Sequence, residues 1–150
     1  MKNLRTITDS YCQYLEQIDS DQLASLDQFV AHNIVFKDPF HQTIGIDNFR
    51  AILNTMFLKF SKTEFKTKKK FFNFDNSENT ASFCWSLKMR HLKTAKIIKI
   101  DGMSFIEIDP KGLIIRHEDY WDPTSNVYQL IPLVGSILRM INKTITTKFR

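Results

Sequence analysis

Four side chains in this sequence combine acid–base chemistry with a predicted position near an apolar interior: Asp38, Tyr14, His117 and Asp119. Asp38 lies in the stretch IVFKDPF, where period-two alternation puts it on the same strand face as Ile34 and Phe36. An ionised carboxylate at the apolar end of a strand is costly to desolvate, so a raised pKa is expected, as a general base or acid requires. The alternative is that Asp-Pro begins a surface turn and that Asp38 is solvated.

The other three side chains also allow two interpretations. Tyr14 falls on the buried stripe of an N-terminal helix, where a phenol either bonds a structural partner or presents its hydroxyl to a ligand. His117 and Asp119 lie two residues apart on a late strand, which is typical of a rim pair as well as of a catalytic dyad. Alternation places one set of residues on a common face of that strand: Leu113, Ile115, His117, Asp119 and Trp121.

The hydrophobic pattern predicts helices first and strands afterwards. Helical periodicity covers residues 4–18, a short segment after Asp19, residues 46–60 after a turn at Gly45, and a C-terminal segment from Pro132. Strands are expected at residues 34–38, 65–74, 81–89, 95–108 and 113–121. This order predicts an α+β fold in which a cone-shaped, curved antiparallel or mixed sheet and N-terminal helices enclose a pocket.

Composition limits the classes of protein that need to be considered. A chain of 150 residues with 43% apolar residues and 13 phenylalanines suits a single domain spanning 1–150, with 124–150 as a helical extension. Cys12 and Cys84 form neither a disulfide scaffold nor a metal-type pair, and neither a signal peptide nor a membrane span is visible. We therefore expect a cytoplasmic protein that uses no metal and no cofactor.

Two stretches carry a family resemblance: YLEQIDSDQLASLDQFVAHNIVFKDPFHQTIGIDNFRAI and, much later, FIEIDPKGLIIRHEDYWD. Over residues 5–123 the chain resembles the nuclear-transport-factor-2-like superfamily, especially its ketosteroid-isomerase and SnoaL-like branch. The most specific pieces are the DPF after the first strand and the closing DYWD. This resemblance implies the same conical fold, and it makes a homodimer the expected assembly.

The resemblance also implies roles for individual residues. The proton-shuttling base of the isomerase falls on Asp38, the oxyanion-stabilising tyrosine on Tyr14, and the second oxyanion donor, an aspartic acid in the isomerase, on Ser104. Because a serine is a weaker donor, efficient steroid isomerisation is not expected. His117 and Asp119 correspond to pocket-lining positions and form a second proton relay. The expected ligand-binding residues are Phe36, Phe40, Trp85, Ser104 and Trp121.

Two functions remain open at this stage. One is a small-molecule enzyme with acid–base chemistry of the isomerase, cyclase or dehydratase type; the other is a non-catalytic module that binds an apolar ligand or dimerises. Nucleic acid is not favoured as a partner, because the lysine-rich segment 59–70 lacks a recognised binding motif. The basic C-terminal helix could contact a membrane surface, although packing over the sheet or the pocket mouth is the preferred prediction.

Overall fold

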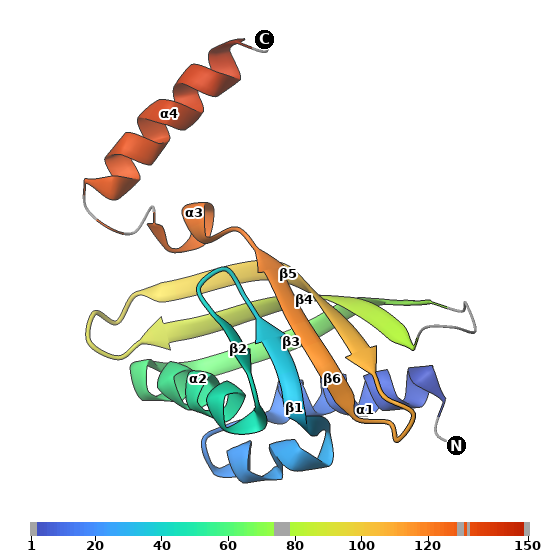
Figure 1. Ribbon diagram of the computed structural model, residues 1–150. Coiled ribbons are helices and arrows are strands. Elements are labelled where there is room, and N and C mark those ends of the chain that lie inside the picture. The colour runs from blue at the N-terminus through green and yellow to red at the C-terminus, as the bar shows by residue number, and fades with distance from the viewer. Residues whose placement is uncertain (1–2, 74–78, 129–130, 132, 149–150) are drawn as a thin grey trace.

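The structure, a computed structural model, describes residues 3–73, 79–128, 131 and 133–148. Figure 1 shows a curved, unclosed sheet with helices on one side and a separate C-terminal helix. The helices are α1 (Leu4–Gln17), the 3₁₀ helix η1 (Asp21–Gln28), α2 (Ile46–Lys59), α3 (Pro123–Asn126) and α4 (Val134–Lys148). The strands are β1 (Val30–Lys37), β2 (Gln42–Ile44), β3 (Phe60–Phe72), β4 (Thr80–His91), β5 (Ile97–Ile108) and β6 (Ile114–Trp121).

The sheet is mixed and confirms the predicted α+β class. Its six strands run in the order β2-β1-β6-β5-β4-β3. β1 and β6 are parallel neighbours, whereas the other adjacent pairs are antiparallel. The parallel pair places the first strand of the chain beside the last one. Consequently the ends of β1 and β6 lie together, although residues 38–117 separate Lys37 from Glu118 in the sequence.

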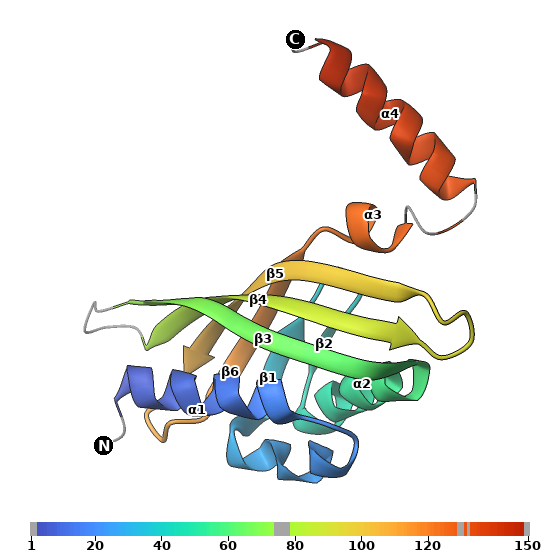
Figure 2. The same cartoon turned by 180° about the vertical axis from the view of Figure 1, so that it is seen from behind.

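Helices α1 and α2 cover the concave face of the sheet. Asn3 caps α1 by accepting a hydrogen bond from the Thr6 amide at 2.8 Å, and the helix then lies against β3 and β4, as Figure 2 shows from behind. Before α2, Gly45 adopts φ +101°, a conformation that glycine accepts without steric cost. α2 buries Phe49, whose ring stacks on Phe36 of β1 at 4.4 Å between centroids.

The alternation predicted for the last strand fails at its start. Ile114 is fully buried, whereas Ile115 lines a pocket outside the core. The β5–β6 register passes from Glu107 opposite Arg116 to Ile108 opposite Ile114, so Ile115 is an extra residue in the ladder. Because of this extra residue, inward-facing positions have odd numbers after the irregularity, as at His117, and even numbers before it, as at Ile114. The predicted common face therefore does not hold for Ile115, which lies on the other side from His117, while His117 is buried as expected.

Other boundaries also differ from the sequence prediction. β3 begins five residues earlier than expected, at Phe60, and β2 and α3 had not been foreseen. The expected end of the first long strand at Phe74 and the expected helix start at Pro132 lie outside the described residues. α4 extends away from the sheet in both views instead of packing on it (Figures 1 and 2). No helix in the described part of the chain is long and apolar enough to cross a membrane.

Candidate functional site

A cavity of about 530 Å³ lies between α2, the end of α1 and the concave face of the sheet. Most of its wall is apolar and comes from α2 and from all strands except β2. The apolar lining includes Phe36, Phe40, Phe49, Ile52, Leu53, Met56, Phe60, Phe65, Trp85, Leu87, Met89, Ile98, Ile100 and Trp121. Asp38, His41, His117 and Asp119 add polar groups to this wall. Such a lining suits an apolar small molecule that carries a few polar atoms.

His117 is the centre of a buried hydrogen-bond network on β6. Its Nδ1 lies 2.7 Å from the hydroxyl of Tyr11, and its Nε2 lies 2.8 Å from Oδ1 of Asp119 and 3.2 Å from Oγ of Ser104. Ser104, opposite Asp119 on β5, donates to the same Oδ1 at 2.5 Å. The Trp85 indole donates to Ser104 at 2.8 Å. Each buried polar group in this network therefore has a partner.

One proton arrangement satisfies the whole network. Asp119 as a carboxylate only accepts, so the neutral imidazole of His117 donates from Nε2 and accepts from the Tyr11 hydroxyl at Nδ1. Burial, followed by the charge of Asp119, raises the pKa of Tyr11 well above its usual value, which keeps its phenol protonated. Oδ2 of Asp119 accepts no hydrogen bond from any residue that the structure describes. This oxygen is available to a bound molecule, because Asp119 lines the cavity.

A second Asp–His pair lies after β1. Oδ1 of Asp38 accepts hydrogen bonds from the amides of Phe40 and His41 at 2.7 and 2.6 Å, and its carboxylate holds the His41 imidazole through Nδ1 at 3.0 Å. Asp38 thus organises a turn, and its side chain, although it takes part in that turn, also lines the cavity. Because Nδ1 of His41 is engaged, its Nε2 is the nitrogen that remains for a ligand.

The two Asp–His pairs differ in which member is more exposed to solvent. In the first pair the side chain of His117 is 4% exposed and that of Asp119 21%, so the carboxylate is the more accessible member. In the second pair Asp38 is 14% exposed and His41 47%, so the imidazole is the more accessible member. Residue 38 and residue 119 each lie one position beyond the paired residues Lys37 and Glu118 of adjacent parallel strands. The cavity therefore presents a carboxylate and an imidazole as separate proton-carrying groups.

The structure does not bring Tyr14 together with these residues. Its hydroxyl donates to the carbonyl of Gln22 at 3.1 Å, its ring stacks on Phe29 at 4.3 Å, and it is not among the described residues that line the cavity. Tyr11, one helical turn earlier, contacts His117 instead. Tyr11 and Tyr14 are three residues apart and so lie on the same side of the helix, and periodicity alone does not show which one reaches the last strand.

Ser104 supports the site from behind the cavity wall. It is fully buried, and its hydroxyl is committed to Asp119, so it positions that carboxylate and does not line the cavity itself. Asp101 precedes Ser104 by three residues, which puts it on the opposite face of a regular strand, and it is exposed and pairs with Lys68 at 2.6 Å. Ser104 and Asp101 therefore have the orientations that alternation predicts.

Gly102 makes room for the indole of Trp85. A Cβ atom on residue 102 would lie 2.5 Å from the Trp85 ring, which is closer than carbon atoms approach. We expect Gly102→Ala to displace the indole, break its hydrogen bond to Ser104 and lower the free energy of unfolding by about 1–3 kcal/mol. Urea unfolding measures that loss, and a changed tryptophan emission maximum reports the displacement. Unchanged stability and emission would contradict this role of Gly102.

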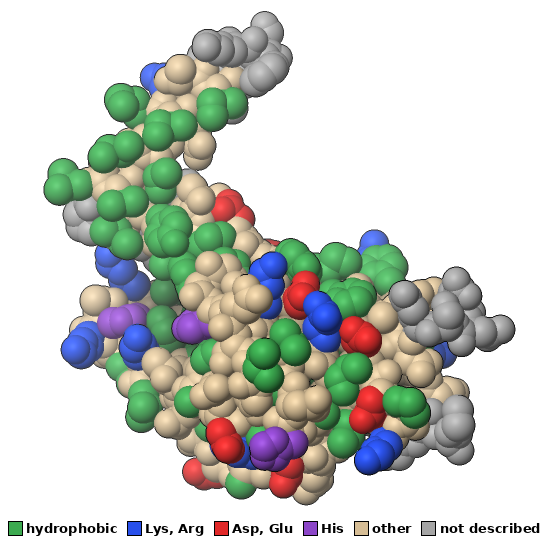
Figure 3. Space-filling view, viewed as in Figure 1, with side chains coloured by type: hydrophobic (Ala, Val, Ile, Leu, Met, Phe, Trp, Pro, Cys, Tyr) green, Lys and Arg blue, Asp and Glu red, His purple; other side chains and the backbone are tan. Residues whose placement is uncertain are grey.

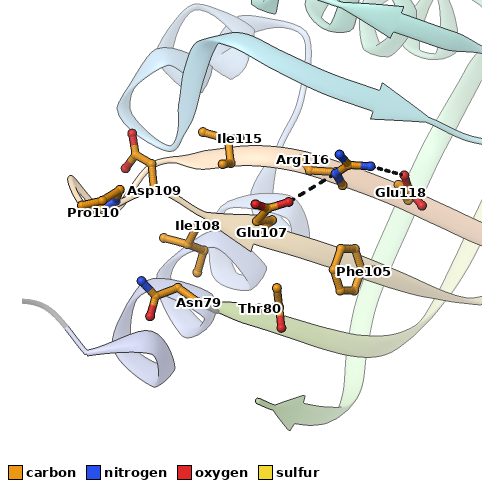
Figure 4. Close-up of a pocket in the computed structure, with 10 residues that line it drawn as sticks. All are labelled: Asn79, Thr80, Phe105, Glu107, Ile108, Asp109, Pro110, Ile115, Arg116 and Glu118. Atoms are coloured by element: carbon orange, nitrogen blue, oxygen red, sulfur yellow. Dashed lines mark hydrogen bonds and ion pairs between the residues drawn. The ribbon is translucent and has the colours of Figure 1, made fainter. Parts of the chain in front are cut away.

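A second pocket, of about 480 Å³, lies where β5 and β6 meet outside the core (Figure 4). Arg116 is the basic group within it, and its guanidinium pairs with Glu107 at 3.3 Å and with Glu118 at 3.2 Å. The charge of Arg116 is thus balanced by two carboxylates at the protein surface, where ion pairs contribute little to stability. The second pocket thus offers no counterpart to the partly buried Asp–His pairs of the first.

Two further groups of side chains were candidates for chemistry: clusters that could hold a metal ion and the buried thiol of Cys12. The residues described contain no cluster of three or more His, Cys, Asp or Glu side chains that could hold a metal ion. Burial raises the pKa of the Cys12 thiol to about 12, so this cysteine stays protonated and inert. Cys12 is also not among the described residues that line the cavity, whereas Asp38, His41, His117 and Asp119 are.

Comparisons with solved structures support the fold assignment. An NTF2-like protein of unknown function from Exiguobacterium sp. 255-15 superposes with a TM-score of 0.66 at 15% identity, over 78% of this chain and 98% of that one. The epoxide hydrolase/cyclase-like enzyme SalBIII, described for pyran ring formation in the polyether salinomycin, superposes with a TM-score of 0.66 at 16% identity, over 81% and 92%.

A third similar structure contains a small amine. A protein with a ketosteroid isomerase-like fold from Catenulispora acidiphila DSM 44928, in complex with trimethylamine, gives a TM-score of 0.65 at 10% identity, over 81% of this chain and 88% of that one. No curated protein matches the sequence significantly. The profile of the SnoaL-like domain family, however, matches residues 12–117, most of the chain. This protein is therefore a member of the SnoaL-like domain family and has the NTF2-like fold.

Proposed function

We propose that the protein binds an apolar small molecule in the cavity and catalyses proton transfer on it without a cofactor, as an isomerase- or cyclase-type enzyme. The observation that carries this proposal is the geometry of Asp119, whose Oδ1 is fixed by His117 and Ser104 while Oδ2 accepts no hydrogen bond from a described residue. A carboxylate can act as a general base when it is held in a fixed orientation and one of its oxygens is free to reach the substrate proton.

In the proposed reaction Asp119 is the general base. Its Oδ2 removes a proton from a carbon next to a carbonyl, and the protonated Asp119 then returns a proton to a carbon of the resulting enol, which restores the carboxylate. In the cyclase-type reaction Oδ2 takes the proton of a hydroxyl group whose oxygen bonds to an electrophilic carbon of the same molecule; the C–O bond at that carbon breaks, its oxygen is protonated, and Asp119 releases its proton to solvent. The surrounding apolar wall strengthens electrostatic interactions, because it lowers the local dielectric constant. Tyr11 acts as a positioning residue, since its bond to Nδ1 fixes the tautomer in which Nε2 of His117 donates to Asp119.

The second proton carrier in the proposal is His41, oriented by Asp38. In its imidazolium form His41 holds Asp38 through Nδ1–H and donates the Nε2 proton to the oxygen on which negative charge develops, and solvent protonates Nε2 again because His41 is exposed. This assignment moves Asp38 from the role of base, which the isomerase resemblance implies, to that of orienting carboxylate. The likeness in fold to SalBIII is compatible with ring-forming chemistry, although fold alone does not determine activity.

The bicyclic ketone 1-indanone offers a test in two steps. Both tryptophans of the chain, Trp85 and Trp121, line the cavity, so binding of the ketone is expected to change tryptophan fluorescence. In D₂O the protein is then expected to speed exchange of deuterium into the carbon beside the carbonyl, followed by mass spectrometry. Leu53→Phe, which fills the cavity, is expected to weaken binding by about tenfold or more.

Leu58→Phe on the same helix is the matched control, because Leu58 is exposed and does not line the cavity. Binding without any exchange above the protein-free rate would favour the alternative of a non-catalytic binding module. If Leu53→Phe and Leu58→Phe affected binding equally, the ketone would not occupy this cavity and the proposal would fail.

A further inference from the structure

Helix α4 carries an exposed apolar stripe that no other part of the described chain covers. Figure 3 shows hydrophobic side chains along this helix, which extends away from the sheet. Ile137 is 54% exposed and Met140 65%, although both are large apolar residues. The other exposed apolar residues of α4 are Val134, Ile141 and Ile145. Exposed apolar side chains that recur at helical spacing on a free helix indicate a binding surface.

All charged side chains in residues 123–150 are basic. After Asp122 the sequence contains no Asp or Glu, whereas Arg139, Lys143, Lys148 and Arg150 are basic. At 100° per residue, Arg139 and Lys143 lie opposite the stripe formed by Ile137 and Ile141. An apolar face backed by basic residues is typical of helices that lie in the interface of an anionic membrane.

The apolar surface continues from α4 to the mouth of the cavity. Phe40, which lines the cavity and is half exposed, packs against Tyr128 at 6.0 Å between ring centroids. Ile131 and Leu133 follow, and both are exposed. The exposed apolar residues thus reach from the cavity wall to the start of α4 (Figure 3). A surface that holds α4 would also lie near the entrance for an apolar ligand.

We propose that α4 docks the protein on anionic membrane surfaces, with its apolar stripe at the boundary of headgroups and acyl chains and with Arg139 and Lys143 on the polar face, where their long side chains reach the anionic headgroups. The helix of 15 residues is about 22 Å long and lies in the plane of the interface. Docking brings the cavity mouth to the lipid surface, from which a poorly soluble apolar molecule can enter. This inference concerns an interaction surface and does not depend on catalysis in the cavity.

Vesicle co-sedimentation of the full chain tests the proposal. We expect binding to vesicles of three parts phosphatidylcholine to one part phosphatidylglycerol, little binding to phosphatidylcholine alone, and weaker binding in about 0.5 M salt. Ile137→Asn with Ile141→Asn should lower the partition coefficient by more than about 100-fold, since two apolar side chains are lost from the interface. Arg139→Gln with Lys143→Gln should lower it by about 30-fold, equivalent to ~1 kcal/mol for each charge.

Lys66→Gln with Lys69→Gln is the matched control, because it removes the same charge from exposed positions on β3 and should leave binding almost unchanged. Equal losses in the two charge variants would overturn docking through α4, as would failure of the wild-type protein to bind the anionic vesicles. If Ile137→Asn with Ile141→Asn converted an oligomer into a monomer without affecting vesicle binding, the stripe would be a contact between copies of the chain, and the proposal would be rejected.

Discussion

Asp119→Asn is expected to lower the rate of deuterium exchange into 1-indanone by about 10³-fold while leaving binding of the ketone within about twofold of wild type. The amide is nearly isosteric with the carboxylate, and its oxygen can still accept from Ser104 and His117. It has no basic oxygen for the substrate proton. Mass spectrometry of the ketone gives the rate, and tryptophan fluorescence gives the affinity.

Two further variants show whether Asp119 or Asp38 is the base. Asp101→Asn removes a carboxylate from the same strand as Ser104 but on the exposed face, where it pairs with Lys68, and should leave the exchange rate unchanged. Asp38→Asn keeps an acceptor for the Phe40 and His41 amides and should reduce the rate far less than Asp119→Asn. The reverse order would assign the base to Asp38, as the isomerase resemblance implies.

His41, the proposed proton donor, could not be recognised from the periodicity of the sequence. Sequence patterns did not identify it, because it lies in the turn between β1 and β2, where neither helical nor strand periodicity applies. The sign that could have pointed to it is its spacing from Asp38, since an Asp at the start of a turn often bonds groups two and three residues later. A histidine three residues after such an Asp can therefore be held by the same carboxylate.

Local patterns were sufficient where the backbone is regular. Alternation placed Ile34, Phe36 and Asp38 on one face of β1, and the structure buries both apolar residues. Alternation failed at Ile115, because an extra residue in the β5–β6 ladder changes which side chains face inward. A bulge of this kind depends on the partner strand, so the sequence of β6 alone does not predict it.

The composition of the buried network also depends on tertiary contacts. Tyr11 and Tyr14 have the same chemistry and lie on the same helical stripe, so only the packing of α1 against the sheet selects Tyr11 as the partner of His117. The direction of α4 is another case. Its periodicity predicts a helix correctly, but an apolar stripe does not reveal whether it faces the same chain, a partner or a lipid surface.

His117→Ala is expected to cause the largest loss of stability among these variants, about 3–5 kcal/mol. The substitution leaves the Tyr11 hydroxyl without its acceptor and takes one donor from the partly buried Asp119. It also opens a void in an aromatic cage, since the rings of Phe36 and Phe49 lie 5.6 and 5.8 Å from the imidazole. Urea unfolding followed by circular dichroism measures the change.

We attribute the predicted loss of stability in His117→Ala to the hydrogen-bond network around His117, so removal of a histidine outside this network should have little effect. His32→Ala, at an exposed position on β1, should change the free energy of unfolding by less than about 0.5 kcal/mol. Tyr11→Phe leaves only the Nδ1 acceptor unpaired and should cost about 1–3 kcal/mol. Because the two residues share a hydrogen bond, the double variant should be less destabilised than the sum of the single ones. Additive losses would mean that Tyr11 and His117 contribute independently, and Tyr11 would then not position the imidazole that holds Asp119.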